Sequence, residues 1–248
     1  MKKFIVMCII GLLLVTLSGC DSMSYGGWFG GGINAVQGRG DMVARNFDTA
    51  SFNGIIVSGG YVVVYRQAET PAVTVQMQEN LFEYLSVSVE NGILRIESDR
   101  SFRTDRGYTP RVYVYAPYLS NLTVAGAATL ENWDTVYTTR LDINISGAAN
   151  GLVYVQVDDL RIDTAGAAGI SLAGTADTAR ITVAGAGDID ASELQTRTAQ
   201  VNISGAGNVE IAVSDTLDAT INGVGNIWYI GSPQVNRTVA GVGRVRER

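Results

Sequence analysis

The chain has 248 residues, and its 18 Lys and Arg against 24 Asp and Glu give a net charge of −6, which is a poor match for the phosphate backbone of nucleic acids. Histidine is absent, so the commonest general base, the commonest metal ligand and any Ser-His or Cys-His nucleophile are excluded. We expect no cofactor, no metal and no nucleic-acid partner.

Residues 1–19 have the layout of a bacterial export signal. Lys2 and Lys3 precede an uncharged apolar stretch, residues 4–17, which is short for a membrane-spanning helix. Leu17-Ser18-Gly19-Cys20 resembles the lipobox of bacterial lipoproteins, in which small residues precede a cysteine. The resemblance implies cleavage before Cys20 and acylation of its thiol, with palmitate among the acyl chains. The alternative is an ordinary signal peptide that happens to end near a cysteine.

The predicted lipid places the protein in the cell envelope, exported from the cytoplasm and attached to a membrane. Cys8 leaves with the signal and Cys20 carries lipid, so the mature domain forms no disulfide. Asp21 resembles the inner-membrane retention signal of enteric lipoproteins, so both the outer face of the inner membrane and the outer membrane stay open. Residues 20–45 are rich in Gly and Ser, which is typical of a flexible tether.

From residue 46 to about 120 the sequence predicts irregularly spaced strands. The expected strands are 55–57, 61–65, 72–76, 85–89, 93–96 and 111–115. Asn91-Gly92 between two alternating stretches is a strong signal for a two-residue hairpin. We expect this half to pack on the first coil of the region that follows and to cover one open end.

Seven copies of one short phrase then run from about residue 120 to 246. In each copy an alternating apolar-polar-apolar stretch leads into a glycine, and these glycines stand 18 to 21 residues apart. A unit of about 19 residues is too short to fold alone and buries its apolar positions by stacking on the next copy. The seven glycines are Gly126, Gly147, Gly166, Gly185, Gly205, Gly223 and Gly241.

The positions around the repeated glycine define the fold. Alternation of apolar and polar residues indicates half-buried strands, and stacked copies predict an all-β, parallel β-solenoid with coils about 4.8 Å apart. Arg-rich residues 244–248 would protect the last strand from edge-to-edge pairing. Four residues before the glycine stand Leu122, Ile143, Ile162, Ile181 and Val201. Three residues after it, a polar ladder is expected from Thr129, Asn150, Asp188, Asn208 and Asn226.

Three features in this order resemble the putative auto-transporter adhesin head, GIN domain family of bacterial envelope proteins. They are the segment 52–60, the hairpin around Asn91-Gly92 and the later Ser/Ala-Gly-Ala-Gly phrases. The resemblance covers about residues 46–245, and we assign residues 46–248 to one GIN-like domain. It implies a right-handed, single-stranded parallel β-helix on an exported or lipid-anchored protein, and it brings no catalytic residues.

The best acidic cluster for chemistry is Asp188, Asp190 and Glu193. Asp188 and Asp190 stand two residues apart and would share a strand face, but neighbouring coils supply only Glu210 as a matching acid. Enzymes on β-helices need clustered carboxylates, often with Ca²⁺. We interpret these residues as solvated corner acids and assign neither catalytic nor metal-binding residues; a weak cation site is the alternative.

Tyrosines are concentrated between residues 61 and 118. If Val112 and Val114 point inward, Tyr113 and Tyr115 point outward, and Tyr61 and Tyr65 would do likewise. Exposed tyrosines favour contacts with proteins or sugars, so these four residues are the candidate partner surface. The alternative is that they pack within the irregular half.

Together these patterns predict a non-enzymatic, lipid-anchored envelope protein that acts as an adhesin-like interaction module or a structural module. Its ligand, a protein or a glycan, and its oligomeric state stay open. The alternative function is a carbohydrate-active or carbohydrate-binding β-helix of the polysaccharide lyase or hydrolase type. A third hypothesis, end-to-end self-association, is opposed by the Arg-rich last coil.

Overall fold

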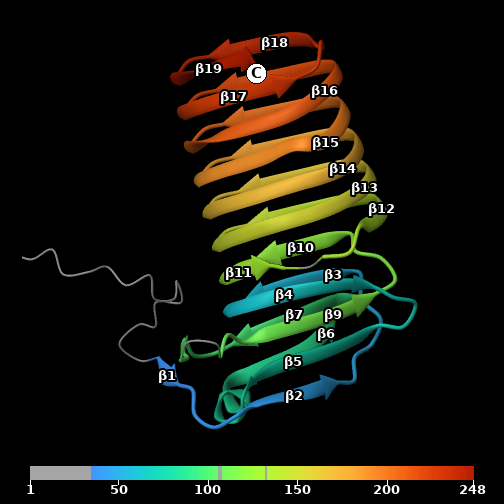
Figure 1. Cartoon of the computed structure of the whole chain (residues 1–248), viewed down its shortest axis with the longest axis vertical. Helices are drawn as coiled ribbons and strands as arrows, with labels where there is room; N and C mark the ends of the chain where they lie inside the picture. The colour runs from blue at the N-terminus through green and yellow to red at the C-terminus, as the bar shows by residue number, and fades with distance from the viewer. Residues whose placement is uncertain (1–34, 106–107, 132) are drawn as a thin grey trace, which may run out of the picture.

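The computed structural model describes residues 35–105, 108–131 and 133–248 and shows a column of stacked coils (Figure 1). The C-terminal coil forms one end, and strands from the first half of the chain form the other (Figure 1). The coils consist of β10 (Asn121–Val124), β11 (Ala127–Leu130), β12 (Val136–Ile145), β13 (Ala148–Thr164), β14 (Ala167–Val183), β15 (Ala186–Ile203), β16 (Ala206–Ile221), β17 (Val224–Ile230), β18 (Gln234–Val239) and β19 (Val242–Glu247).

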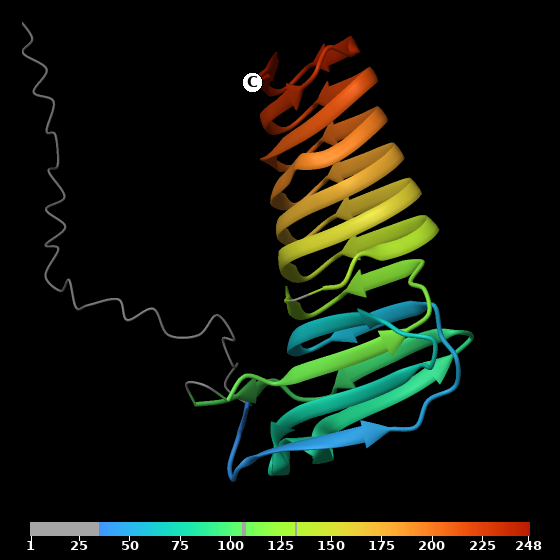
Figure 2. The same ribbon diagram turned by 45° about the vertical axis from the view of Figure 1, so that its right-hand side comes forward.

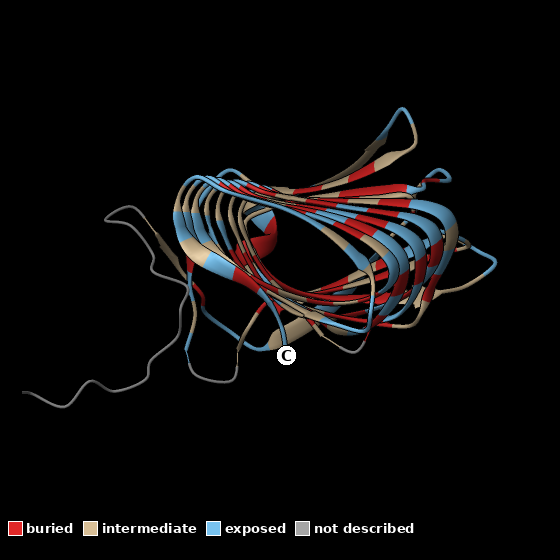
Figure 3. Ribbon diagram, turned by 90° about the horizontal axis from the view of Figure 1, so that it is seen from above, coloured by how far each residue is buried: buried red, intermediate tan, exposed pale blue. Residues whose placement is uncertain are grey.

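Successive coils pair in parallel and in register. Ile143 of β12 lies beside Ile162 of β13, and Ile162 lies beside Ile181 of β14. The register advances by about 19 residues per coil, as the repeat predicts. The predicted parallel β-solenoid is therefore confirmed, and its coils enclose a core that is continuous along the column (Figure 3).

The predicted apolar column fills that core. Leu122, Ile162 and Val201 are each fully buried, and along the chain the core includes residues from Phe52 to Val245. The column ends with Ala219, beside which the last coil places Arg237. Arg237 is exposed, so charge takes the place of an apolar side chain at the end of the column.

Crowding between corners explains the repeated glycine. A Cβ atom placed on Gly147 would overlap the carbonyl oxygen of Gly126, and one on Gly166 would overlap that of Gly147. These glycines are not in the left-handed region of φ, so the requirement is space rather than backbone conformation. Only a residue without a side chain lets consecutive corners approach closely enough for their backbones to hydrogen-bond.

The polar ladder forms over the later coils. The Asn208 side-chain amide donates to Asp188 Oδ1 at 2.9 Å, and the Asn226 amide donates to Asn208 Oδ1 at 3.2 Å. Asn150 is not in contact with this series, because Gly169 stands between it and Asp188 in the register. The prediction is thus confirmed for three of its members.

The first half of the chain supplies the other end of the column. β1 and β8 form a separate two-stranded pair, and the remaining strands join the large sheet that contains the coils. The elements are β1 (Val36–Gln37), β2 (Met42–Phe47), β3 (Gly54–Ser58), β4 (Gly60–Gln67), β5 (Ala72–Gln78), the 3-10 helix η1 (Glu79–Tyr84), β6 (Leu85–Glu90), β7 (Ile93–Ser98), β8 (Phe102–Arg103) and β9 (Arg111–Ala116).

The stacking order departs from the chain order in this half. β3 and β4 pair in parallel with β10 and β11 on one side, and with β7 and β9 on the other. Gly59 lies directly under Gly126, so the glycine corner already exists before the repeat begins. This half packs on the first coil as expected, and it also extends the parallel stack.

Antiparallel strands end the stack at this side. β6 and β7 form the predicted hairpin, with Asn91 and Gly92 as its two loop residues at φ values of 52° and 76°. β5 pairs antiparallel with both β9 and β2. Leu81 and Phe82 of η1 are buried against the core. We call residues 35–116 the cap; it covers one end of the column as predicted (Figure 2).

Candidate functional site

The predicted lipidation residue, Cys20, lies outside the described residues, as do the signal and most of the tether. Within the part that the structure describes, none of the helices has the length and apolar character needed to cross a bilayer. Membrane attachment through Cys20 therefore stays a prediction.

Tyr61 and Tyr65 do not belong to a partner surface. Both side chains are fully buried, pointing into the core from β4 together with Val63. Val62 and Val64, on the other face of β4, are also only 4% and 3% exposed. Since β4 is apolar on both faces, alternation gave no direction for its side chains, and the prediction that Tyr61 and Tyr65 point outward is wrong.

The hydroxyl groups of both buried tyrosines form hydrogen bonds within the cap, and the Tyr65 ring also contacts a residue of the first coil. The Tyr65 hydroxyl donates to the Ala116 carbonyl oxygen at 3.3 Å, and its ring lies 5.4 Å from that of Trp133. The Tyr61 hydroxyl is hydrogen-bonded to Ser98. Burial raises the pKa of Tyr61 to about 12, although the hydrogen bond from Ser98 acts in the opposite direction. Burial and the negative charge of Asp134 raise the pKa of Tyr65 to about 12.

Tyr113 and Tyr115 occupy the outer face of β9, as predicted from the inward direction of Val112 and Val114. Both tyrosines are half-buried, whereas the two valines are fully buried. Tyr113 lies between Val64 and Thr74 in the register and helps to cover Val64. These two residues therefore remain candidates for a partner surface on the cap.

Three acidic residues of the later coils, Asp188, Asp190 and Glu210, are engaged within the protein. Asp188 accepts hydrogen bonds from Asn208, and Asp190 accepts from the Ser192 hydroxyl at 2.6 Å. Glu210, beside Asp190, pairs with Arg248. Among the described residues no group of three or more Asp, Glu, Cys or His side chains is placed to hold a metal ion.

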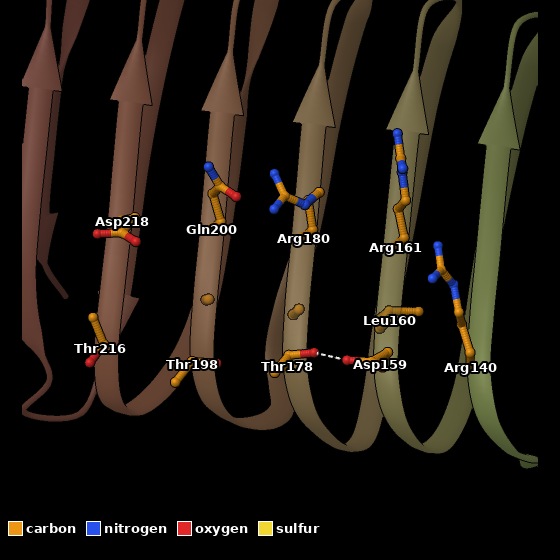
Figure 4. Close-up of a pocket in the computed structure, with 12 residues that line it drawn as sticks. Arg140, Asp159, Leu160, Arg161, Thr178, Arg180, Thr198, Gln200, Thr216 and Asp218 are labelled. Atoms are coloured by element: carbon orange, nitrogen blue, oxygen red, sulfur yellow. Dashed lines mark hydrogen bonds between the residues drawn. The ribbon is translucent and has the colours of Figure 1, made fainter.

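A polar hollow of about 530 Å³ lies on the outer face of β12–β16, at a place that sequence analysis missed (Figure 4). In its central row Arg161 lies beside Arg180, Arg180 beside Gln200, and Gln200 beside Asp218. A neighbouring row contains Asp159 and the threonines Thr178, Thr198 and Thr216. The hollow thus offers guanidinium, amide, carboxylate and hydroxyl groups at the spacing of the strands.

The hollow has a sequence signal of its own. The outward position five residues before each corner glycine is, from β12 to β16, Asp142, Arg161, Arg180, Gln200 and Asp218. Aligning the outward positions of the repeat, as well as the inward ones, would have shown that this position is charged or an amide in five consecutive coils and is arginine in two of them. What the sequence did not show is that these positions share one concave face.

No curated protein matches the chain. A solved structure from Bacteroides fragilis, described as a putative adhesin, has 22% identity and a TM-score of 0.81, covering 86% of this chain and 100% of its own. One from Parabacteroides distasonis, also described as a putative adhesin, has 26% identity and a TM-score of 0.62, with coverages of 87% and 100%. A second Parabacteroides distasonis structure, described as a putative lipid binding protein, has 23% identity and a TM-score of 0.65, with coverages of 86% and 99%.

The matched family model is described as "Putative auto-transporter adhesin, head GIN domain", and it covers residues 51–233, from the cap through β17. That range contains the glycine corners from Gly59 to Gly223, the buried tyrosines and the polar hollow. By this match the chain belongs to the GIN-domain family of adhesin heads.

Proposed function

We propose that the protein is a lipid-anchored, non-catalytic adhesin-like module that projects a rigid column from a membrane of the cell envelope. The observation that carries this proposal is the direction of the chain along the column, from the cap to the C-terminal coil. β1 and β2, the first described strands, belong to the cap, and the C-terminal coil lies at the opposite end (Figure 1). A lipid on Cys20 would therefore attach the protein at its cap, with the coils directed away from the bilayer.

The coils are suited to display rather than to chemistry. Catalysis by carboxylates needs a pair of acids that are free to exchange protons and are placed on the two sides of one bond. Asp188, Asp190 and Glu210 instead accept hydrogen bonds or ion pairs from neighbouring side chains. The family membership and the putative-adhesin structures support the same role.

The anchoring is tested by replacing Cys20 with Ser in the full chain expressed in a bacterial host. We expect the wild-type protein in the membrane fraction with acyl label incorporated from palmitate, and the variant without label. Ser18→Ala keeps the small residue before the cleavage site and serves as the matched control. Equal labelling or equal membrane association of wild type and Cys20→Ser would contradict lipid anchoring.

The non-catalytic role is tested separately with the purified soluble domain. Incubation with a panel of neutral and acidic polysaccharides, followed by measurement of reducing ends and of unsaturated products, should show no turnover. Release of either product above the level of a heat-denatured sample would place the protein among the carbohydrate-active β-helices instead.

A further inference from the structure

Arg180 differs from the arginines of the two preceding coils in lacking an acidic partner. Arg140 pairs with Asp142 at 3.1 Å, and Arg161 pairs with Asp163 at 2.6 Å, in each case two residues along the same strand. At the equivalent position after Arg180 the chain has Thr182. In the part of the chain that the structure describes, Arg180 forms no ion pair.

The lack of an acidic partner for Arg180 also affects the balance of charge between neighbouring strands. Arg161 and Arg180 lie directly opposite each other on neighbouring strands, an arrangement of like charges that disfavours the sheet unless an anion compensates it. Asp163 compensates Arg161. The guanidinium of Arg180 is exposed in the hollow between Arg161 and Gln200 (Figure 4).

We propose that this hollow binds an acidic polysaccharide, with one carboxylate of the sugar chain held by Arg180. A guanidinium presents a rigid fork of donors that matches a carboxylate with two parallel hydrogen bonds. The side-chain amide of Gln200 lies beside Arg180, and the hydroxyl of Thr198 lies beside Thr178 in the neighbouring row; both line the hollow and supply further hydrogen-bonding groups. The carboxylate would take the place that Asp163 has beside Arg161.

The rest of the hollow is suited to sugar hydroxyl groups. Thr178, Thr198 and Thr216 form one row across β14–β16, and Asp218 extends the row of Arg180 and Gln200. Donors and acceptors therefore recur at the strand spacing of about 4.8 Å, which is comparable with the length of one pyranose residue. A sugar chain lying along the column would place successive hydroxyl groups over successive strands.

An acidic peptide fits this face less well. Peptides commonly bind a sheet by adding a strand to an open edge. Here β13, β14, β15 and β16 are paired on both sides within the stack, so their backbone groups are already used. Recognition must come from side chains alone, which favours a ligand rich in hydroxyl groups.

The test compares two changes that act on Arg180 in different ways. Arg180→Gln removes the charge, and Thr182→Asp gives Arg180 the internal acid that Arg161 has. Thr238→Asp is the matched control, because it adds the same charge on the same outward column, at a strand with no arginine two residues earlier. Arg180 and Thr238 are exposed, so Arg180→Gln and Thr238→Asp should keep the urea midpoint of wild type. Thr182→Asp places its carboxylate opposite Asp163 and should lower that midpoint slightly while the chain stays folded.

Binding is measured by titration calorimetry with polygalacturonate, its neutral methyl ester, free galacturonic acid and polyglutamate. We expect polygalacturonate to bind best, and its affinity to fall with salt. Arg180→Gln and Thr182→Asp should each weaken it by about tenfold or more, while Thr238→Asp stays within about twofold of wild type. Absence of polygalacturonate binding, equal losses in Thr182→Asp and Thr238→Asp, or tighter binding of polyglutamate or of the methyl ester would overturn the proposal.

This inference rests on the proposed role as a non-catalytic binding module. The experiment distinguishes a failure of the proposed site from a failure of the proposed role. Analysis of the polygalacturonate recovered from the titration shows whether it has been shortened. Shortened chains would overturn the non-catalytic function, whereas intact chains that do not bind would overturn only the site at Arg180.

Discussion

The two ends of the column are built differently. At the cap end, antiparallel strands and the helix η1 close the core, with Leu81 and Phe82 buried and Arg45 stacked on the Phe82 ring at 4.2 Å. At the C-terminal end of the described chain, β18 and β19 pair in parallel with the coils before them and antiparallel strands are absent. Val239 is 43% exposed and Val242 is 70% exposed there, and the outer edges of β18 and β19 make no pairing within the described chain.

This difference shows that a repeat extends a fold but does not end it. Every coil presents the same strand edge to the next coil. The edge of the last coil therefore needs another feature that prevents further pairing. The cap reverses strand direction and adds large aromatic side chains, whereas the C-terminal end has the exposed Arg237 at the end of the apolar column and Arg244 and Arg246 along β19. Charge on an open edge discourages pairing with another chain.

The largest effect is expected where the cap joins the coils. Trp133 is 5% exposed, stacks on Tyr65 and donates to the Val63 carbonyl oxygen at 2.9 Å. Trp133→Ala should lower the free energy of unfolding by about 4 kcal/mol in urea titrations, because it leaves a cavity and removes one of the two hydrogen bonds to the Val63 carbonyl oxygen. Tyr137→Ala, at a side chain that is 53% exposed, is the control. Equal losses in both variants would show that the junction is not specifically packed.

A smaller but still severe effect is expected at a coil corner. Gly166→Ala places a methyl group against the Gly147 carbonyl oxygen, and we expect a loss of about 3 kcal/mol. Gly187→Ala is the matched control, since its Cβ would lie 3.2 Å from the nearest atom, the Ala168 carbonyl oxygen, and the preceding coil already has alanine there. If the two changes are equally tolerated in urea titrations, close approach of the corners is not what selects glycine.

The smallest effect is expected in the pH dependence of stability, through the buried Tyr61 of the cap. Burial raises the pKa of Tyr61 from 10.0 to about 12, so the folded state keeps its proton while the unfolded chain ionises. Its stabilising contribution is complete below pH 10 and is lost as the pH rises to 12, by about 2 kcal/mol. Urea titrations between pH 9 and pH 12 measure this loss.

Tyr61→Phe removes the titrating group and should make the alkaline decline shallower, at the expense of the hydrogen bond to Ser98. The exposed Tyr154 of the coils supplies the control variant, Tyr154→Phe, which should leave the decline as it is in wild type. An unchanged decline in Tyr61→Phe would mean that other groups control alkaline unfolding.

The sequence by itself determined the parts of the fold that repeat or that depend on neighbouring residues. The glycine period and the inward column of Leu122, Ile143 and Ile162 specified parallel coils, because each copy can bury its apolar face only against the next. Asn91-Gly92 specified a hairpin, because both residues accept positive φ. The same alternation gave the directions of Val112 and Tyr113 correctly.

Only the tertiary structure decided what depends on residues far apart in the chain. Ile55 pairs with Leu94 on one side and with Leu122 on the other, so β7 and β9 insert beneath β3 and β4 against the chain order. That insertion buries Tyr61, whose strand is apolar on both faces and therefore carries no directional pattern. The hollow around Arg180 likewise arises only when neighbouring coils bring their outward rows onto one face, since no single strand contains the site.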